Sequence, residues 1–167
     1  VASMSNGMLD GEFMILDDDD APLGVNLNWL SLENEGDAVD PLYSVNPVEV
    51  PDVDFSTERL LVDGEDFGRW SFNYRATEHG GRFEDLEVVA LGVQVANGSL
   101  SEWDYKDGQH VSRFTGEIMI DDLAEAQQNF GFASSIEGED LKLTADVRWD
   151  GSPAMLDIER ASGEVEI

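Results

Sequence analysis

The chain of 167 residues is 41% hydrophobic and 28% charged, so it is long enough and apolar enough to form a hydrophobic core. Its 37 acidic and 9 basic residues give a formal net charge of −28. A surface of that charge repels nucleic-acid phosphates and anionic head groups, so we expect no nucleic-acid partner. No apolar run approaches the ~18 residues that a membrane-spanning helix requires.

The acidic residues are scattered through every segment rather than pooled in a tail. This distribution favours a solvated acidic shell, as in halophilic proteins that work in high salt, where the Debye length is about 3 Å at 1 M. The absence of cysteine excludes disulfides and thiolate metal sites.

The first part of the chain predicts a β-hairpin. Residues 8–16 and 24–29 have strand patterns, and an acidic turn at 17–22 separates them. The run Asp17–Asp20 raises a calcium hypothesis, but it lacks the spaced oxygen ligands and central glycine of an EF-hand loop. We therefore favour a solvated turn there and expect no metal site.

Residues 33–53 contain three prolines and no alternation, which indicates an irregular or edge segment. From residue 54 onward the chain alternates between apolar runs and turn signals about every ten residues, the pattern of an antiparallel meander. The expected strands are Phe55–Val62, Phe67–Thr77, Arg82–Leu91, Val93–Tyr105 (with a break at Asn97–Gly98) and Val111–Ile120. The expected turns are Glu65–Asp66, Gly80–Gly81 and Asp107–Gly108.

One short α-helix is predicted near 122–131. Asp122 can cap it with Glu125 three residues on, Leu123 and Phe130 share a face, and Gly131 is a suitable stop. Two strands follow, Leu141–Trp149 and Met155–Ile167, joined by a turn at 150–153. The apolar positions of the last strand change parity, which predicts a bulge near Glu159–Arg160.

No pattern in the sequence indicates catalysis. With 37 carboxylates, neighbouring acids arise by chance and carry little weight for acid–base chemistry. His79 and His110 lie beside glycine-containing turns, so we expect both to be surface turn residues rather than ligands. No nucleophile elbow, P-loop, zinc-protease or dinucleotide motif occurs. We therefore expect a protein that is not an enzyme, without catalytic residues or a cofactor.

The predicted sheet has one apolar face that needs a cover. About eight strands at ~4.8 Å spacing and ~30 Å length present a face of roughly 1,100 Å². A ten-residue helix is about 15 Å long and about 10 Å wide, so it covers a small fraction of that face. The rest must pack on itself, meet another segment or face an apolar ligand. Alternation alone cannot distinguish a closed core from an open groove, and for an arbitrary β domain we favour the core.

An ordered series of short motifs runs along the chain. Its pieces are Val50–Phe55, Leu60–Gly64, Phe67–Phe72, Thr115–Gly116, Asp122–Leu123, Phe130–Gly131 and Trp149–Pro153. In order and approximate spacing this series resembles the YhdP proteins, members of the AsmA-like family that also includes TamB. The similarity runs from about residue 8 to the end, and two departures are the acidic excess and Asp150.

This resemblance implies a mainly β protein with a curved, antiparallel, taco-shaped sheet, of which 1–167 is a single segment excised from a larger periplasmic protein. Family members are anchored in the inner membrane, through a helix that lies outside this segment, and extend across the periplasm. Their apolar groove is thought to conduct phospholipids towards the outer membrane. The implied partners are phospholipid acyl chains and neighbouring β segments of the same full-length protein.

If the face is a groove, the strand patterns select seven residues to contact acyl chains, and ordinary core packing is their alternative role. They are Trp70, Phe72, Tyr74, Leu141, Leu143, Val147 and Trp149. A second hypothesis is a structural or interaction β module of an envelope protein that binds no lipid itself. A third, a glycan-binding sandwich or hydrolase, depends on exposed tryptophans and carboxylates alone.

The acidic shell generates the first testable prediction. Because salt screens repulsion among like charges, the melting temperature should rise markedly between dilute buffer and 1 M KCl. Thermal unfolding followed by circular dichroism at both salt concentrations measures the difference. An unchanged melting temperature would contradict the salt-adapted interpretation.

Overall fold

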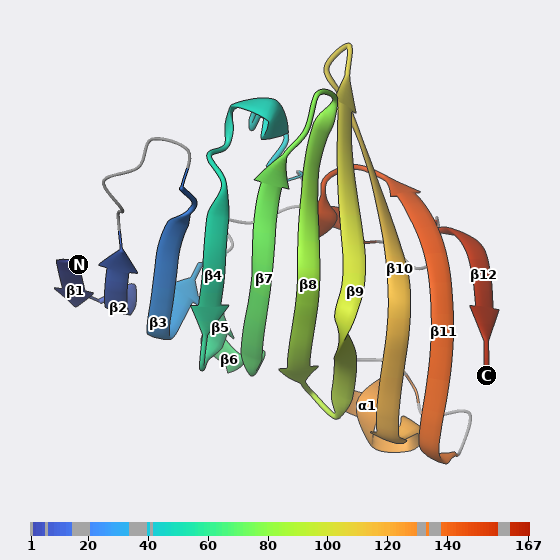
Figure 1. The fold of residues 1–167 in the computed structure, drawn as a ribbon. Coiled ribbons are helices and arrows are strands. Elements are labelled where there is room, and N and C mark those ends of the chain that lie inside the picture. The colour runs from blue at the N-terminus through green and yellow to red at the C-terminus, as the bar shows by residue number, and fades with distance from the viewer. Residues whose placement is uncertain are drawn as a thin grey trace.

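A computed structural model describes residues 2–5, 7–14, 21–33, 40, 42–129, 133, 138–156 and 161–167. Within these residues the chain forms one curved sheet of twelve strands, together with one α-helix and two short 3₁₀-helices (Figure 1). The expectation of a mainly β protein with one short helix is confirmed. The predicted turn at 17–20, the end of the helix at 130–131 and the bulge near 159–160 lie outside the described residues.

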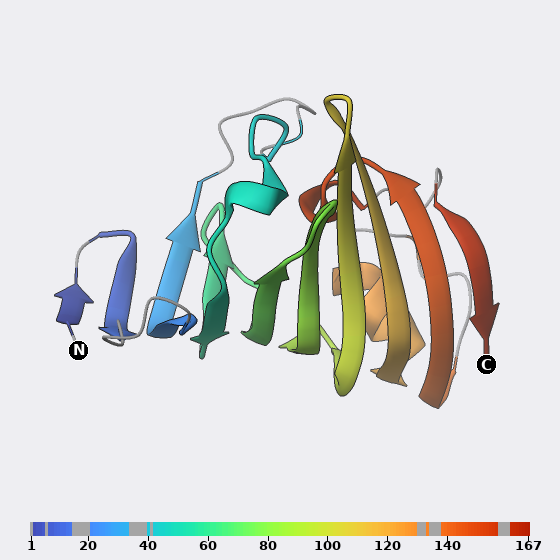
Figure 2. The same cartoon turned by 45° about the horizontal axis from the view of Figure 1, so that its top comes forward.

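The main path of the sheet follows chain order. β5 and β6 branch from β3, and the ends of the path, β1 and β12, lie at opposite sides of the molecule, so the described sheet is open (Figure 2). The strands are β1 (Ala2–Ser5), β2 (Leu9–Met14), β3 (Leu23–Leu32), β4 (Val53–Thr57), β5 (Leu60–Val62), β6 (Glu65–Asp66), β7 (Arg69–Ala76), β8 (Gly80–Ala90), β9 (Val93–Lys106), β10 (Gln109–Asp122), β11 (Glu139–Asp150) and β12 (Ser162–Glu166).

Two-residue turns with positive φ connect three of the hairpins. Asp107 and Gly108 have φ of 55° and 78°, as expected for the predicted turn, and Leu91 and Gly92 have φ of 54° and 80°. The predicted turn at Glu65–Asp66 is wrong, because those residues pair with Val62 and Leu61 as β6. The turn lies two residues earlier, at 63–64, where Asp and Gly adopt φ of 53° and 82°.

The predicted single strand Phe55–Val62 is also wrong, because it is divided into β4 and β5. Both pieces pair with β3, and this pairing is parallel in an otherwise antiparallel sheet. At the break, Glu58 donates its N–H to Leu27 O at 3.1 Å and Arg59 O accepts from Leu30 N at 2.9 Å. Contact with β3 therefore continues across the break, while the other neighbour changes from β7 to β6.

Gly80 and Gly81 do not form the predicted tight turn with positive φ. They begin β8, and Gly81 pairs with Ala76 of β7. A Cβ atom on Gly81 would collide with the ring of Tyr74, and one on Gly80 would collide with the carbonyl oxygen of Trp103. Glycine is required here for close approach of neighbouring atoms, rather than for an unusual backbone conformation.

A β-bulge in β8 changes which residues face each side of the sheet. The pairing of β8 with β9 shifts between Phe83 and Leu86, and Asp85 has a φ of 50°. The Asp85 carboxylate accepts a hydrogen bond from the Asn73 amide at 3.1 Å. Odd-numbered and even-numbered positions therefore exchange sides at the bulge. β9 runs unbroken through 97–98, so the break expected there is a shift in pairing instead.

The predicted helix is present as α1 (Leu123–Asn129), and the capping prediction is confirmed. Asp122 Oδ1 accepts a hydrogen bond from the Glu125 N–H at 3.0 Å, which satisfies one of the free donors of the first turn. The 3₁₀-helices are η1 (Pro47–Glu49) and η2 (Pro153–Met155), each opened by a proline and capped by the polar side chain before it.

The glycine at the start of β8 gives a prediction for stability. Gly81→Ala should destabilise the fold by about 1–3 kcal/mol, because the buried Tyr74 ring must move to admit a methyl group. Urea denaturation measures the loss. Gly7→Ala is the matched control, since its added Cβ would meet nothing within 4 Å. Equal stability of the two variants would contradict the packing argument.

Candidate functional site

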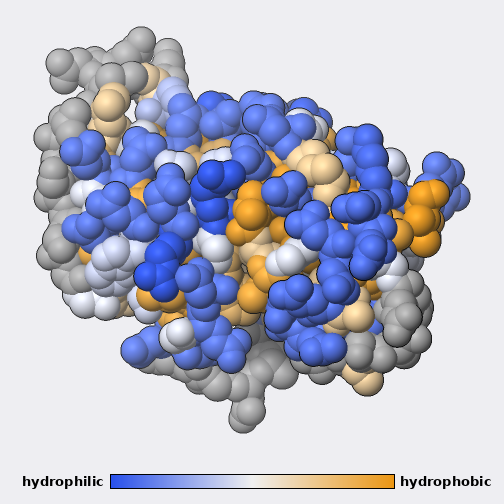
Figure 3. Space-filling view, turned by 90° about the horizontal axis from the view of Figure 1, so that it is seen from below, coloured by the Kyte–Doolittle hydropathy of each residue, from blue (hydrophilic) through white to orange (hydrophobic). Residues whose placement is uncertain are grey.

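The candidate site is an apolar groove on one face of the sheet, here called the inner face and defined by Phe72, Val88, Phe114 and Val147. The groove has a volume of about 370 Å³, and fifteen of the sixteen described residues that line it are apolar. Seen from below, apolar residues are exposed in the middle of the molecule with hydrophilic residues around them (Figure 3). The lining residues are Phe67, Trp70, Phe72, Phe83, Leu86, Val88, Ala90, Val93, Val95, Ser101, Phe114, Ile118, Val147, Trp149, Pro153 and Leu156.

One wall of the groove is a row of aromatic rings that crosses three strands. Phe55 of β4 stacks on Phe72 of β7 with ring centroids 4.9 Å apart, and Phe83 of β8 meets Phe72 edge-on at 5.0 Å. Such pairs stabilise each other beyond the apolar area they bury. The row therefore forms a rigid apolar surface rather than a collapsible one.

The segment before β4 covers the inner face beside β7. Tyr74 is only 2% exposed, and its hydroxyl donates a hydrogen bond to the carbonyl oxygen of Pro47 at 2.5 Å. Burial raises the pKa of Tyr74 to about 12, and the negative charge of Asp52 contributes in the same direction. The tyrosine therefore stays protonated and fixes η1 over the end of β7 and β8.

The same covering segment is held a second time through His110 of β10. Trp103 donates its indole N–H to His110 Nδ1 at 2.9 Å, so Nδ1 is the acceptor and the other ring nitrogen, Nε2, carries the proton. His110 Nε2 lies 2.8 Å from the carbonyl oxygen of Tyr43 and donates to it. The expectation that His110 is a surface turn residue is wrong, because the side chain is only 5% exposed. His79, by contrast, is exposed as expected.

A second covering segment follows β11. Trp149 donates its indole N–H to the carbonyl oxygen of Ser152 at 2.9 Å. Ser152 in turn donates to Asp40, from its N–H at 2.8 Å and from its hydroxyl at 2.6 Å. Burial alone would raise the pKa of Asp40, but these bonds and one from the Leu42 N–H outweigh it and hold that pKa below its usual value. The two covering segments are thus joined to each other.

Helix α1 covers the opposite end of the inner face. Its Ala126 is buried and lies close to Gly92, in the turn between β8 and β9. Asn129 donates to the carbonyl oxygen of Leu91 at 3.2 Å. Among the described residues, the groove is the part of the apolar face left between this helix and the two covering segments.

Comparison of the sequence with models of protein families identifies the family of the chain. The family model described as YhdP protein matches residues 2–167. The chain belongs to the YhdP family. Proteins of this family belong to the bacterial envelope. No curated protein and no solved structure matches the chain.

Among the described residues, no helix is both long enough and apolar enough to cross a bilayer. In the same part of the chain, no three histidine, aspartate or glutamate residues are arranged to hold a metal ion. The described residues that line the groove offer an apolar surface.

Of the seven residues selected from the sequence, four line the groove: Trp70, Phe72, Val147 and Trp149. Tyr74 lies on the same face but beneath η1. Leu141 and Leu143 belong to the same strand as Val147 and lie nearer to α1, outside the groove lining. Alternation in β8, β9 and β10 could also have selected Val88, Val95 and Phe114, which the sequence analysis did not.

Asp40 generates a prediction about the cover. Asp40→Asn should destabilise the fold by about 1 kcal/mol at pH 7, because one of the donors of Ser152 or Leu42 would then face an amide N–H₂ group. Since the native pKa of Asp40 is lowered, its stabilising effect is present above the unfolded pKa of about 3.9 and is lost as pH falls through the native value.

Urea denaturation at pH 7 and pH 3 measures both effects, and the difference between wild type and Asp40→Asn should shrink at the lower pH. Asp150→Asn removes an equal charge from an exposed neighbouring position and serves as the control. A difference that grows on acidification would contradict the assignment.

Proposed function

We propose that the chain is a segment of a periplasmic protein, anchored in the inner membrane, whose groove carries phospholipid acyl chains towards the outer membrane. The observation that supports this most strongly is the groove itself, in which Ser101 is the one polar residue among the described residues of the lining. Protein interiors are close-packed, so an apolar hollow of this size on a partly covered face is not an ordinary core. Such surfaces mark binding sites.

An acyl chain fits the chemistry of this surface. Each buried methylene group contributes about 0.8 kcal/mol, so a segment of several methylenes would bind without any polar contact. Leu156 lines the groove and is 54% exposed, so the groove has an apolar rim that water reaches. A protein with this role binds and guides its ligand, and we expect no enzymatic activity.

A second candidate function is a structural or interaction module in the envelope. It is favoured by β12, which pairs with β11 on one side and lies at the end of the strand order. Val165 and Ile167 at this edge are 54% and 91% exposed. An uncovered edge strand is a template for pairing, so a neighbouring β segment of the full-length protein would extend the sheet there. Both functions can coexist, and only the first requires lipid.

Photo-crosslinking in cells tests the lipid function. A benzophenone amino acid in place of Phe72 or Val147 should capture phospholipid, because both side chains line the groove. Thr144 is the control, since it lies on the same strand as Val147 but its side chain is exposed on the opposite face. Captured lipid is identified by mass spectrometry after protease digestion.

Capture at 72 and 147 should exceed capture at 144 several-fold. Equal capture at the three positions would contradict the groove assignment, as would the absence of phospholipid from the protein in native mass spectrometry. In that case the interaction module becomes the better explanation.

A further inference from the structure

The described basic residues fall into two groups, those that form an ion pair and those that do not. Nine Lys and Arg residues occur, of which Arg160 lies outside the described residues. Six of the other eight form ion pairs: Arg59–Asp66, Arg69–Glu87, Arg75–Asp54, Arg82–Glu102, Arg113–Asp146 and Lys142–Glu117. Within the described part of the chain, Lys106 and Arg148 remain without an ion pair, although acids outnumber bases fourfold.

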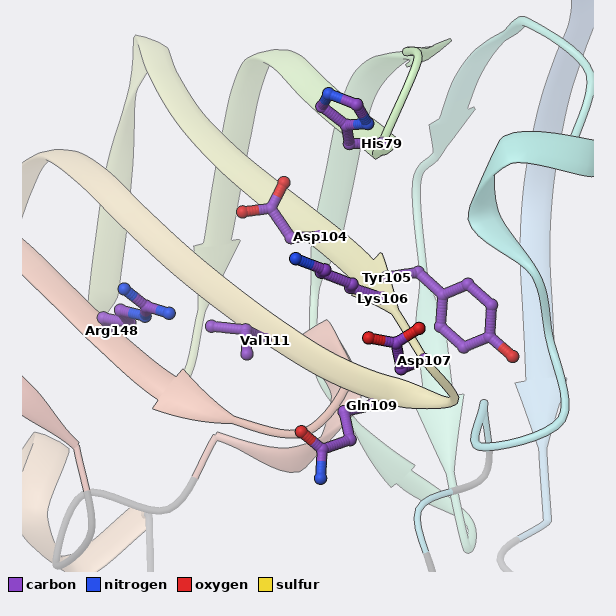
Figure 4. A pocket seen from close by; sticks show the side chains of 8 residues that line it. All are labelled: His79, Asp104, Tyr105, Lys106, Asp107, Gln109, Val111 and Arg148. Carbon is purple, nitrogen blue, oxygen red and sulfur yellow. The ribbon is translucent and has the colours of Figure 1, made fainter.

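These two cations line the same hollow. It has a volume of about 670 Å³ and lies near the tip of the β9–β10 hairpin. It is on the side of the sheet opposite the inner face, here called the outer face. Figure 4 shows the Lys106 ammonium and the Arg148 guanidinium extending towards each other with Val111 between them. The hollow is therefore separate from the groove, because Arg148 and the groove residues Val147 and Trp149 alternate along β11.

The placement of Arg148 does not serve the stability of the sheet. Its partner directly across the β10–β11 ladder is Arg113, and like charges in opposite positions destabilise a strand pair. Arg113 is occupied by the Asp146 carboxylate, which raises the pKa of Arg113 through hydrogen bonding and charge, but no acid among the described residues pairs with Arg148 in the same way. An unpaired guanidinium in a costly position is better explained by a ligand.

The hollow also carries the opposite charge. Asp104 and Asp107 line it together with the imidazole of His79, and the Asp104 carboxylate lies on the same side of the hairpin as the Lys106 ammonium (Figure 4). A ligand of net negative charge would be repelled by the −28 of the whole chain. A ligand with one anionic and one ammonium centre is neutral overall, so it avoids that repulsion and can still use both kinds of side chain.

We propose that this hollow binds a zwitterionic group of the phosphoethanolamine class. The phosphate lies between Lys106 and Arg148, where the guanidinium can donate two hydrogen bonds to it. The ammonium lies against the carboxylate of Asp104, on the side of Lys106 away from Asp107 (Figure 4). This site is on the outer face and does not depend on the groove, so either can fail without the other.

Titration of the isotope-labelled protein with O-phosphoethanolamine, followed by amide NMR shifts, tests the proposal. Shifts should concentrate at 104–111 and at Arg148. Glycerol 3-phosphate lacks the ammonium and ethanolamine lacks the phosphate. Each should therefore bind at least roughly tenfold more weakly than O-phosphoethanolamine. Equal binding of glycerol 3-phosphate, or no localised shifts with any of the three, would overturn the proposal.

Two variants assign the contacts. Arg148→Gln and Asp104→Asn should each weaken binding of O-phosphoethanolamine by roughly tenfold, since each removes a charge-assisted contact. Lys142→Gln is the matched control for Arg148→Gln, because it removes one positive charge from the same face of the same strand but from an existing ion pair. An equal loss in Lys142→Gln would show a general charge effect and would overturn the proposal.

A second experiment distinguishes a lipid head group from soluble phosphoethanolamine as the source of the bound group. Nanodiscs with phosphatidylethanolamine are compared with nanodiscs of phosphatidylglycerol, and the Arg148→Gln variant is tested on both. Binding that requires both phosphatidylethanolamine and Arg148 supports the proposal and assigns a lipid head group. Binding of the soluble ester alone supports it and assigns a free or carried phosphoethanolamine.

Discussion

The site depends on where the N–H and O–H groups of buried aromatic side chains find hydrogen-bond acceptors on an otherwise apolar face. Tyr74, Trp103 and Trp149 are buried there, and each has one N–H or O–H that must find a partner. Those partners are supplied by the covering segments, directly at Pro47 and Ser152 and through His110 at Tyr43. The positions of these three rings therefore determine how far the cover extends, and the groove is the area beyond their reach.

The two faces of the sheet follow different rules. On the inner face, apolar contacts and a few buried hydrogen bonds define a fixed shape. On the outer face, exposed cross-strand ion pairs such as Arg69–Glu87 and Arg82–Glu102 contribute little individually. They do arrange most of the few basic residues beside acids, and this makes the unpaired Lys106 and Arg148 conspicuous. A single layer of strands thus presents an apolar face on one side and a polar face on the other.

Local patterns were sufficient for most of the strands and for the turn at 107–108, because alternation and the preference of Asp-Gly for turns act over a few residues. They failed where a distant partner decides. Gly81 is explained by the ring of Tyr74, and His110 is buried by Tyr43, 67 residues away in sequence. Period two also cannot tell which part of a strand is covered, so Trp149 and Leu141 had the same pattern although only Trp149 lines the groove.

The bulge at Asp85 changes which positions of β8, odd or even, face the groove. Phe83 before it and Val88 and Ala90 after it all line the groove, although their positions differ in parity. Pairing of β8 without the bulge, with all its residues kept, would impose strict alternation from Phe83 and turn the second half of the strand over. Glu87 and Val89 would then face inward, placing a carboxylate against the groove. The apolar lining of β8 therefore depends on the bulge as much as on the identity of the side chains.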